Sequence, residues 1–98
     1  MLRIIKVRGQ SMAPTLLDGD YVLTKSASTY DVGRIYLIDH SDLGLIIKRL
    51  ESEAPNGRLT FAGDNPVSNS GNILGTIEKA RVRARAFLRL SPKGCNRL

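Results

Sequence analysis

The sequence predicts a single, mostly β domain of antiparallel strands, and three observations support this fold class. First, 98 residues is about the length of one domain. Second, short apolar runs recur along the chain and are separated by turn signals rich in Gly, Asn and Asp. Third, residues 81–87 alternate Arg with apolar residues. The chain has no repeat, low-complexity tract or linker, so residues 1–98 are taken as one domain, with 91–98 as a flexible tail.

The expected strands follow one another with short connections. They cover residues 2–8, 20–25, 34–39, 44–50, 58–62 and 81–87. The first alternates charged and apolar residues and ends at Gly9, and the second follows a turn at Gly19. The third and fourth flank a polar hairpin loop at residues 40–42, and Asn56-Gly57 marks a tight turn before the fifth.

The sixth strand has the clearest pattern, because Arg81, Arg83 and Arg85 occupy every second position. Such alternation is typical of a strand with one solvated face and one packed face. Arg residues on an exposed strand face more often protect a sheet edge than bind a ligand. The pattern therefore accounts for part of the positive charge without requiring a partner.

The composition is that of a globular protein with a basic surface. Lys and Arg number 15 against 9 Asp and Glu, which gives a net charge of +6. Such a surplus can attract phosphates, anionic lipid or an acidic protein, or it can be a solvated surface without a dedicated partner. Because aromatic residues make up 5% of the chain and Trp is absent, a wide aromatic platform for nucleic acid is not expected.

No part of the chain predicts a membrane span or a secretory signal. It contains no run of about 18–20 apolar residues, and residues 1–8 lack the apolar core of a signal peptide. Cys95 is the single cysteine, which excludes an internal disulfide and fits a reducing compartment. The protein is therefore expected in the cytoplasm or peripherally on a membrane.

A turn that contains a serine is the first candidate for chemistry. Directly after the first predicted strand, the chain reads Gly9-Gln10-Ser11-Met12-Ala13-Pro14-Thr15-Leu16. Gly9 permits close approach of a substrate backbone, and the backbone N–H of a turn residue such as Ser11 can stabilise an oxyanion. A serine in a turn is more often structural than catalytic, so this segment alone does not identify an enzyme.

A lysine inside an apolar strand is the second candidate. Lys48 follows Ile46 and Ile47. Burial disfavours the ammonium form and lowers its pKa, and a neutral amine beside a serine hydroxyl can accept the hydroxyl proton. An outward-facing lysine on a half-exposed strand is the simpler interpretation of this segment alone. His40 offers a Ser–His alternative, but it lies in a polar loop with no evident acid partner.

Two turn-rich segments complete the set of candidates. Residues 17–22 read Leu-Asp-Gly-Asp-Tyr-Val, and residues 62–71 read Ala-Gly-Asp-Asn-Pro-Val-Ser-Asn-Ser-Gly. Each segment by itself is an ordinary connection between strands.

Taken together and in this order, the four segments resemble the signal peptidase I family of Ser–Lys dyad serine peptidases. The matching motifs are Gly-x-Ser-Met-x-Pro-Thr-Leu, Gly-Asp-x-Val, Lys-Arg and Gly-Asp-Asn-Pro, between Val7 and Gly75. The related LexA-like self-cleaving proteases share the dyad and the β fold. The Gly-Asp-Asn and Lys-Arg motifs favour signal peptidase I, as does the lack of a DNA-binding helical region before Ser11. The resemblance implies a coiled or barrel-like antiparallel sheet.

The resemblance also implies a role for each matching residue, and it implies neither a metal nor a cofactor. Ser11 would be the nucleophile and Lys48 the general base. The oxyanion site and substrate cleft would involve Gly9, Met12 and Pro14. The supporting residues would be Arg49, Asp64, Asn65 and either Ser68 or Ser70, one of which would orient Lys48. The domain would then be a peptidase catalytic domain that cleaves a leader or signal-type segment from a protein precursor by acyl-enzyme hydrolysis.

The chain departs from the signal peptidase pattern after Gly63-Asp64-Asn65. In that family the loop continues into Ser-x-Asp-Ser-Arg, whereas the Asp-Ser-Arg portion is missing here, as is the usual N-terminal anchor. A minimal, soluble or peripheral maturation peptidase therefore fits better than a general secretory signal peptidase. Small bacterial members that trim leader peptides from precursors are similar in size.

Two other classes stay open at this level. One is a LexA-like self-cleaving domain, for which the ten residues before Ser11 offer a poor cleavage site. The other is a non-enzymatic basic β domain that binds nucleic acid, with binding that would depend steeply on salt. The precursor, the cleavage-site preference and the oligomeric state do not follow from the sequence.

Overall fold

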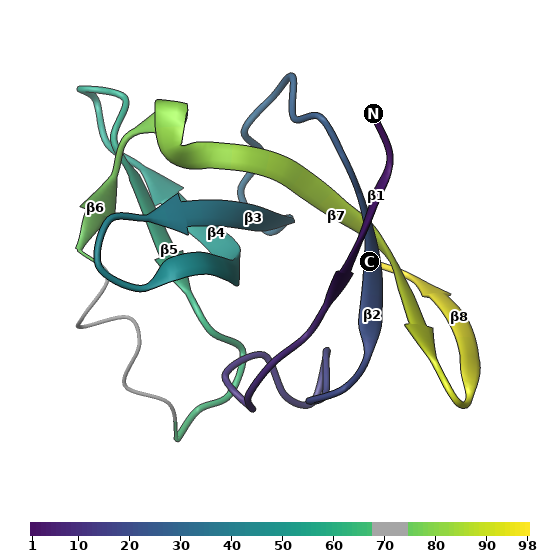
Figure 1. Cartoon of the computed structure of the whole chain (residues 1–98). Helices are drawn as coiled ribbons and strands as arrows, with labels where there is room; N and C mark the ends of the chain where they lie inside the picture. Colours follow the sequence, from purple (N-terminus) through teal and green to yellow (C-terminus); the bar gives the residue numbers. More distant parts are fainter. Residues whose placement is uncertain (68–74) are drawn as a thin grey trace.

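The computed structural model describes residues 1–67 and 75–98, and almost all of their regular structure is β (Figure 1). The elements are β1 (Arg3–Lys6), β2 (Tyr21–Lys25), β3 (Ile35–His40), β4 (Gly44–Glu53), β5 (Leu59–Ala62), β6 (Thr76–Ile77), a short 3-10 helix η1 (Lys79–Arg81), β7 (Val82–Ser91) and β8 (Gly94–Arg97). All strand pairs are antiparallel and belong to one sheet. The predicted fold class, a mostly β single domain, is confirmed.

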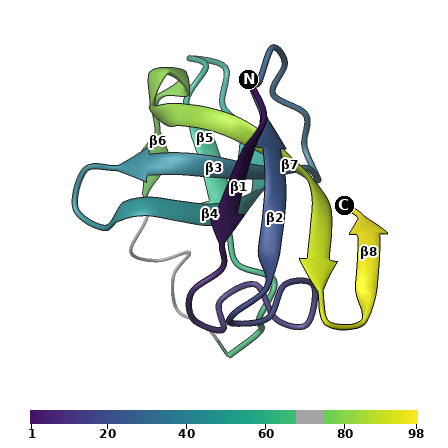
Figure 2. The same cartoon turned by 45° about the vertical axis from the view of Figure 1, so that its right-hand side comes forward.

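The sheet curls into a half-barrel (Figures 1 and 2). Its strand order is β1-β2-β7-β3-β4-β5-β6, with β8 paired to β7. The long strand β7 pairs with β2, β3 and β8 along its 10 residues. Its registers shift opposite Leu23/Thr24 in β2 and opposite Leu37/Ile38 in β3. Such bulges bend a strand and increase its twist, which allows one sheet to curve around its own core.

The third strand is buried on both faces and lies between two apolar clusters. Because side chains alternate along a strand, Tyr36 and Ile38 enter one cluster while Ile35 enters the other. The first cluster is completed by Leu50, Leu59, Phe61 and Ile77. The second contains Val7, Met12, Leu16, Val22 and Ala86. Met12 and Leu16 belong to the serine-containing turn, so this turn is packed into the core.

All six predicted strands are present, and two are longer than predicted. β4 continues to Glu53 and β7 continues to Ser91. In both cases the extra residues pair with another strand: those of β4 pair with β5, and those of β7 pair with β2 and β8. The length of these strands therefore depends on partners that a local pattern does not show. The two-residue strand β6 has no sequence signal of its own.

The segment predicted as a flexible tail, residues 91–98, contains a strand instead. β8 pairs with β7 in a register that runs from Leu88↔Arg97 to Ser91↔Gly94. Pro92 and Lys93 form the connecting turn, and Gly94 has a positive φ of 119°, a conformation that glycine adopts readily. Residues 94–97 show no alternation of apolar and polar side chains, so the sequence pattern does not reveal the strand.

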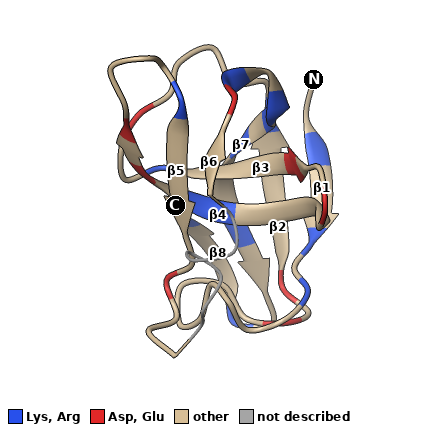
Figure 3. Ribbon diagram, turned by 90° about the vertical axis from the view of Figure 1, so that its left-hand side faces the viewer, with Lys and Arg blue, Asp and Glu red and all other residues tan. Residues whose placement is uncertain are grey.

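The basic residues are distributed over several strands, with acidic residues between them (Figure 3). On β7, the guanidinium of Arg83 donates to Asp39 at 2.9 Å and that of Arg89 donates to Asp20 at 2.8 Å. Part of the Arg pattern therefore stabilises the sheet by ion pairing between neighbouring strands. None of the helical structure in the described ranges is long and apolar enough to cross a membrane.

Candidate active site

Ser11 and Lys48 line the same cleft, which has a volume of about 360 Å³. Its other lining residues come from β1 and the residues directly after it (4–8), from β4 (45–47), and from Met12 and Leu37. Most of these side chains are apolar. The fold therefore brings a hydroxyl and an amine from distant parts of the chain to one apolar depression.

The turn that carries Ser11 is held by its own backbone and by the core. The N–H of Ala13 donates to the carbonyl of Gln10 at 3.1 Å, and the N–H of Leu16 donates to the carbonyl of Met12 at 2.9 Å. The side chains of Met12 and Leu16 are fully buried. Ser11 itself is half-buried and reaches the cleft. A hydroxyl on a turn with buried neighbours is positioned firmly while it stays accessible.

Lys48 lies in the middle of β4, opposite Tyr36 of β3, and its exposed fraction is 5%. Desolvation by burial lowers the pKa of its ammonium group. No ion pair of Lys48 is found among the described residues, so nothing there offsets the cost of burying its charge. A lower pKa leaves a larger fraction of the amine neutral at a given pH, which makes the lysine a better proton acceptor.

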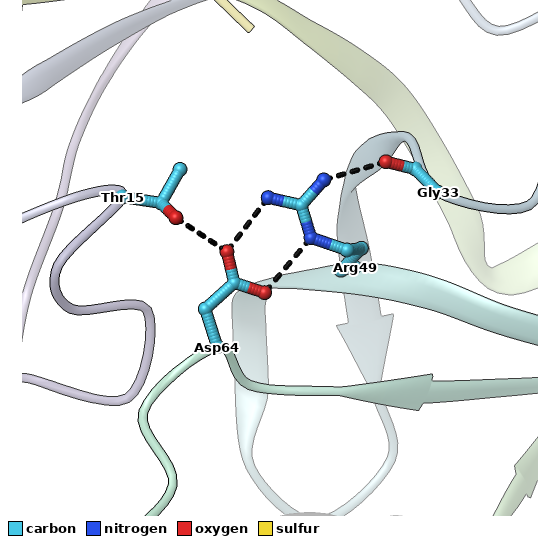
Figure 4. Close-up of polar contacts among 4 residues, drawn as sticks. All are labelled: Thr15, Gly33, Arg49 and Asp64. Atoms are coloured by element: carbon cyan, nitrogen blue, oxygen red, sulfur yellow. Dashed lines mark hydrogen bonds and ion pairs between the residues drawn. The ribbon is translucent and has the colours of Figure 1, made fainter.

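The next residue on β4, Arg49, connects the lysine strand to the serine turn through Asp64 (Figure 4). Arg49 donates from Nε to Asp64 Oδ1 at 2.8 Å and from Nη2 to Oδ2 at 2.6 Å. The hydroxyl of Thr15 donates to the same Oδ2 at 2.6 Å, and Arg49 Nη1 donates to the carbonyl of Gly33. The hydrogen bonds from Arg49 are the main reason that the pKa of Asp64 is lowered, against the opposing effect of burial, with Thr15 contributing further. The same hydrogen bond raises the pKa of Arg49.

Asn65 also holds the serine turn, through two hydrogen bonds. Its backbone N–H donates to the carbonyl of Ser11 at 3.0 Å, and its side-chain amide donates to the carbonyl of Gln10 at 2.9 Å. Its side-chain oxygen accepts from the N–H of Val67 at 3.0 Å. The family resemblance implied that Asp64 and Asn65 help to hold the lysine-bearing region in place. In the structure Asp64 joins the lysine strand to the serine turn, and Asn65 contacts the turn.

The remaining predicted site residues have different positions. Met12 lines the cleft, whereas Gly9 and Pro14 are exposed and are not among its lining residues. Gly9 has a φ of 79°, and its N–H donates to Asp18 at 2.7 Å, so it shapes the entry to the turn. Ser68 and Ser70 lie outside the described residues.

His40 lies at the end of β3 and does not line the cleft. Its Nδ1 accepts hydrogen bonds from the backbone N–H groups of Asp42 at 3.0 Å and Leu43 at 3.1 Å. The imidazole therefore stabilises the β3–β4 turn, and the Ser–His alternative has no support from its position.

Sequence reasoning treated Asp20 as part of an ordinary turn and did not single out Thr15. Asp20 is buried and accepts from the N–H of Leu17 at 2.9 Å as well as from Arg89. It therefore ties the end of the serine turn to β7. Thr15 belongs to the motif that carried the resemblance, and its contact with Asp64 is the structural reason for a hydroxyl at that position.

The described part of the chain contains no group of three or more His, Cys, Asp or Glu residues that could hold a metal ion. The polar side chains that line the cleft are those of Ser11, Lys48, Lys6 and Arg8.

Comparison with known families gave a match over most of the chain. A family model described as Peptidase S24-like matches residues 1–87, which include Ser11, Lys48, Asp64 and Asn65. No curated protein sequence matches the chain.

Proposed function

The chain belongs to the Peptidase S24-like family, and on that premise we propose that it is a serine endopeptidase with Ser11 as nucleophile and Lys48 as general base. The family lies in the clan that unites LexA-like proteins and signal peptidases. One observation carries the assignment of residues: Ser11 and Lys48 line one cleft, and the lysine is almost fully buried.

The proposed reaction is acyl transfer to the serine followed by hydrolysis. The neutral amine of Lys48 takes the proton of the Ser11 hydroxyl, and Ser11 Oγ forms a bond to the scissile carbonyl carbon. The negative charge on the carbonyl oxygen is stabilised by backbone N–H groups of the turn, that of Ser11 among them. The Lys48 ammonium then gives its proton to the departing amine as the peptide bond breaks. A water molecule, deprotonated by Lys48, cleaves the ester and regenerates the serine.

The contacts of residues 64 and 65 support this mechanism by limiting how far the two reacting groups can move. Asp64 joins Arg49, the neighbour of Lys48, to Thr15 on the serine turn. Asn65 holds the peptide carbonyls of Gln10 and Ser11. A displacement of about 1 Å in such a pair can cost about 10²-fold in rate, so these contacts are expected to matter for kcat.

The substrate we propose is an extended segment of a protein precursor, cut at a leader or signal-type junction. β1 is the end strand of the sheet and pairs with β2 alone in the described part of the chain. An extended peptide can add to such an edge by main-chain hydrogen bonds, and β1 leads directly into the Ser11 turn. The Gly63-Asp64-Asn65 and Lys48-Arg49 motifs favour precursor processing of the signal peptidase kind.

The dyad can be tested with a defined library of synthetic peptides, with products identified by mass spectrometry. Ser11→Ala and Lys48→Met should each lower the cleavage rate by at least about 10³-fold, and the double variant should be no worse than either, because the two residues act as one unit. Acid-quenched protein should carry an ester adduct on Ser11 during turnover.

Two matched controls accompany this test. Ser41→Ala and Lys93→Met change an exposed serine and an exposed lysine outside the cleft, and both should cleave at the wild-type rate. Circular dichroism should show the same β content for all variants. Full cleavage by Lys48→Met would show that another group is the base. Full cleavage by Ser11→Ala would show that Ser11 is not the nucleophile.

Self-cleavage of the LexA-like kind is the second candidate, because the clan of the matched family includes LexA-like proteins as well as signal peptidases. Intact-mass measurements of the purified protein over time, at several protein concentrations, separate the two. A truncation whose first-order rate is independent of concentration and is lost in Ser11→Ala indicates cleavage within one chain. A stable mass together with cleavage of library peptides indicates a processing enzyme.

A further inference from the structure

The cleft has a charge that the proposed reaction does not use. Lys6 and Arg8 line it beside the apolar side chains, and no Asp or Glu is among the lining residues. Both cations are exposed. Neither takes part in an ion pair with any residue that the structure describes, whereas Arg49, Arg58, Lys79, Arg83 and Arg89 all do. The cleft thus presents two positive charges whose counter-charges are not supplied by the described chain.

The two cations share one side of the segment that leads to the nucleophile. Val7 is buried in the second apolar cluster and Ile5 packs against it. Because side chains alternate along an extended chain, Lys6 and Arg8 face the opposite side, in line with the exposed Ile4. Residues two apart on a strand lie about 6.5–7 Å from each other along the chain. Figure 3 shows Lys or Arg at both ends of β1.

This spacing matches the repeat of an extended peptide bound to the β1 edge. Alternate side chains of such a peptide would lie beside Lys6 and Arg8. The intervening side chains of the peptide would point the other way, toward the cluster that contains Val7. Opposite charges across neighbouring strands attract, and like charges repel. An acidic residue at either of the two alternate positions therefore gains a partner, while a basic residue meets a like charge.

We infer that the cleft selects an acidic segment: a substrate with Asp or Glu at one or both of two alternate positions on one side of the scissile bond, paired with Lys6 and Arg8. The inference rests on the proposed peptidase function and adds a substrate class to it. Lys6 and Arg8 are specificity residues in this scheme, and Ser11 and Lys48 remain the reacting groups.

The test uses three alanine-based peptides that carry Glu, Gln or Lys at two alternate positions and are otherwise identical. Their affinity for the Ser11→Ala variant is measured by calorimetry in low salt, and the binding site is located by the amide NMR shifts of residues 4–8 and 45–48. Each Glu should strengthen binding by roughly two- to five-fold over Gln, and Lys should weaken it. Because the Debye length falls from about 10 Å at 0.1 M salt to about 3 Å at 1 M, high salt should remove most of the difference.

Charge-reversal variants provide the decisive comparison. Lys6→Glu combined with Arg8→Glu should reverse the order so that the Lys peptide binds best. Lys93→Glu changes the charge of an exposed lysine outside the cleft and should leave the order unchanged. Equal affinity for the three peptides, or no binding of any of them, would overturn the inference. The same holds if the Lys93→Glu variant shows the reversed order.

Two further outcomes separate this inference from its alternatives. If the three peptides bind equally and vesicles containing phosphatidylglycerol bind in a manner that needs Lys6 and Arg8, the cations belong to a membrane contact and the inference is wrong. If library peptides are cleaved in a Ser11-dependent manner without preference for acidic residues, the inference fails and the peptidase function stands. Charge-selective binding without any cleavage supports the acidic-segment cleft and contradicts the peptidase function.

Discussion

Replacing Lys48 with methionine should stabilise the protein while it removes the proposed base. The lysine is 5% exposed, and burial lowers the pKa of its ammonium group below the ordinary 10.5. Between the lowered pKa and 10.5, the folded state holds a neutral amine while the unfolded state holds an ammonium ion. Unfolding therefore takes up a proton in this range, and the stability of the wild type rises with pH until the unfolded lysine also loses its proton. Below the lowered pKa, the full cost of the buried charge is present.

The size of the effect follows from the same linkage. Each unit by which the folded pKa lies below the unfolded one corresponds to about 1.4 kcal/mol of lost stability at low pH. Methionine has a similar length and no charge, so Lys48→Met should recover this amount below the lowered pKa and remove the part of the pH dependence that Lys48 contributes. In a domain of this size, 1 kcal/mol corresponds to a shift in Tm of about 4–8 °C. A gain of several degrees is therefore expected in a variant that has lost its activity.

The assay is urea unfolding followed by circular dichroism at a series of pH values, and it needs no substrate. The control is Lys93→Met, which removes an exposed lysine and should change neither the midpoint nor its pH dependence. The reasoning would be refuted if Lys48→Met were as stable as Lys93→Met at every pH, because the ammonium of Lys48 would then be solvated. A solvated lysine has no lowered pKa and no advantage as a base.

Three further predictions concern the residues around the dyad. The kcat/KM for peptide cleavage should rise with pH through the lowered pKa of Lys48, since only the neutral amine accepts a proton. A rate that first rises at or above the ordinary lysine pKa of 10.5 would contradict the assignment. Asp64→Asn should lower the free energy of unfolding by about 1–2 kcal/mol, allowing for the partial exposure of Arg49. Because the pKa of Asp64 is lowered, the wild type should be more stable than this variant above the ordinary pKa of 3.8. The difference in the free energy of unfolding should fade as the pH falls through the lowered pKa, and acid titration of both proteins would show this. In steady-state assays, Asn65→Ala should reduce kcat more than it changes KM, because the carbonyl of Gln10 loses its hydrogen bond from the Asn65 side chain. The control Asn56→Ala, which changes an asparagine in another turn, should leave both constants unchanged.

The fold could be predicted in outline because its strands have strong local patterns. The apolar run at residues 35–38 predicts a strand, and the structure buries it on both faces between two clusters. The alternation of Arg with apolar residues predicts β7, and Ala84 and Ala86 are indeed buried. The sequence pattern fails where pairing with another strand, rather than side-chain alternation, makes the strand. This is the case for β8, whose four residues are all exposed and depend on β7 for their hydrogen bonds.

The resemblance named candidate site residues, but the contacts of these residues came only from the structure. The resemblance singled out Ser11, Lys48, Arg49, Asp64 and Asn65 as candidates. In the structure Ser11 and Lys48 line one cleft, Arg49 is hydrogen-bonded to Asp64, and Asn65 is hydrogen-bonded to the serine turn. The sequence does not show that Asn65 holds the serine turn, because the contacts of a loop depend on what packs against it.

The local sequence by itself determined which segments form strands and which turn carries the serine, because propensity and alternation act over a few neighbouring residues. It did not determine whether Lys48 faces water or the interior. Residues 46–49 are two apolar residues followed by two basic ones. This pattern fits a strand in which Lys48 faces water as well as one in which Lys48 faces the interior. The tertiary structure decided the matter: pairing with β3 and curling of the sheet turn Lys48 inward beside the Ser11 turn, while Arg49 is held by Asp64. Burial is a property of the assembled sheet, and it is burial that lowers the pKa of the amine.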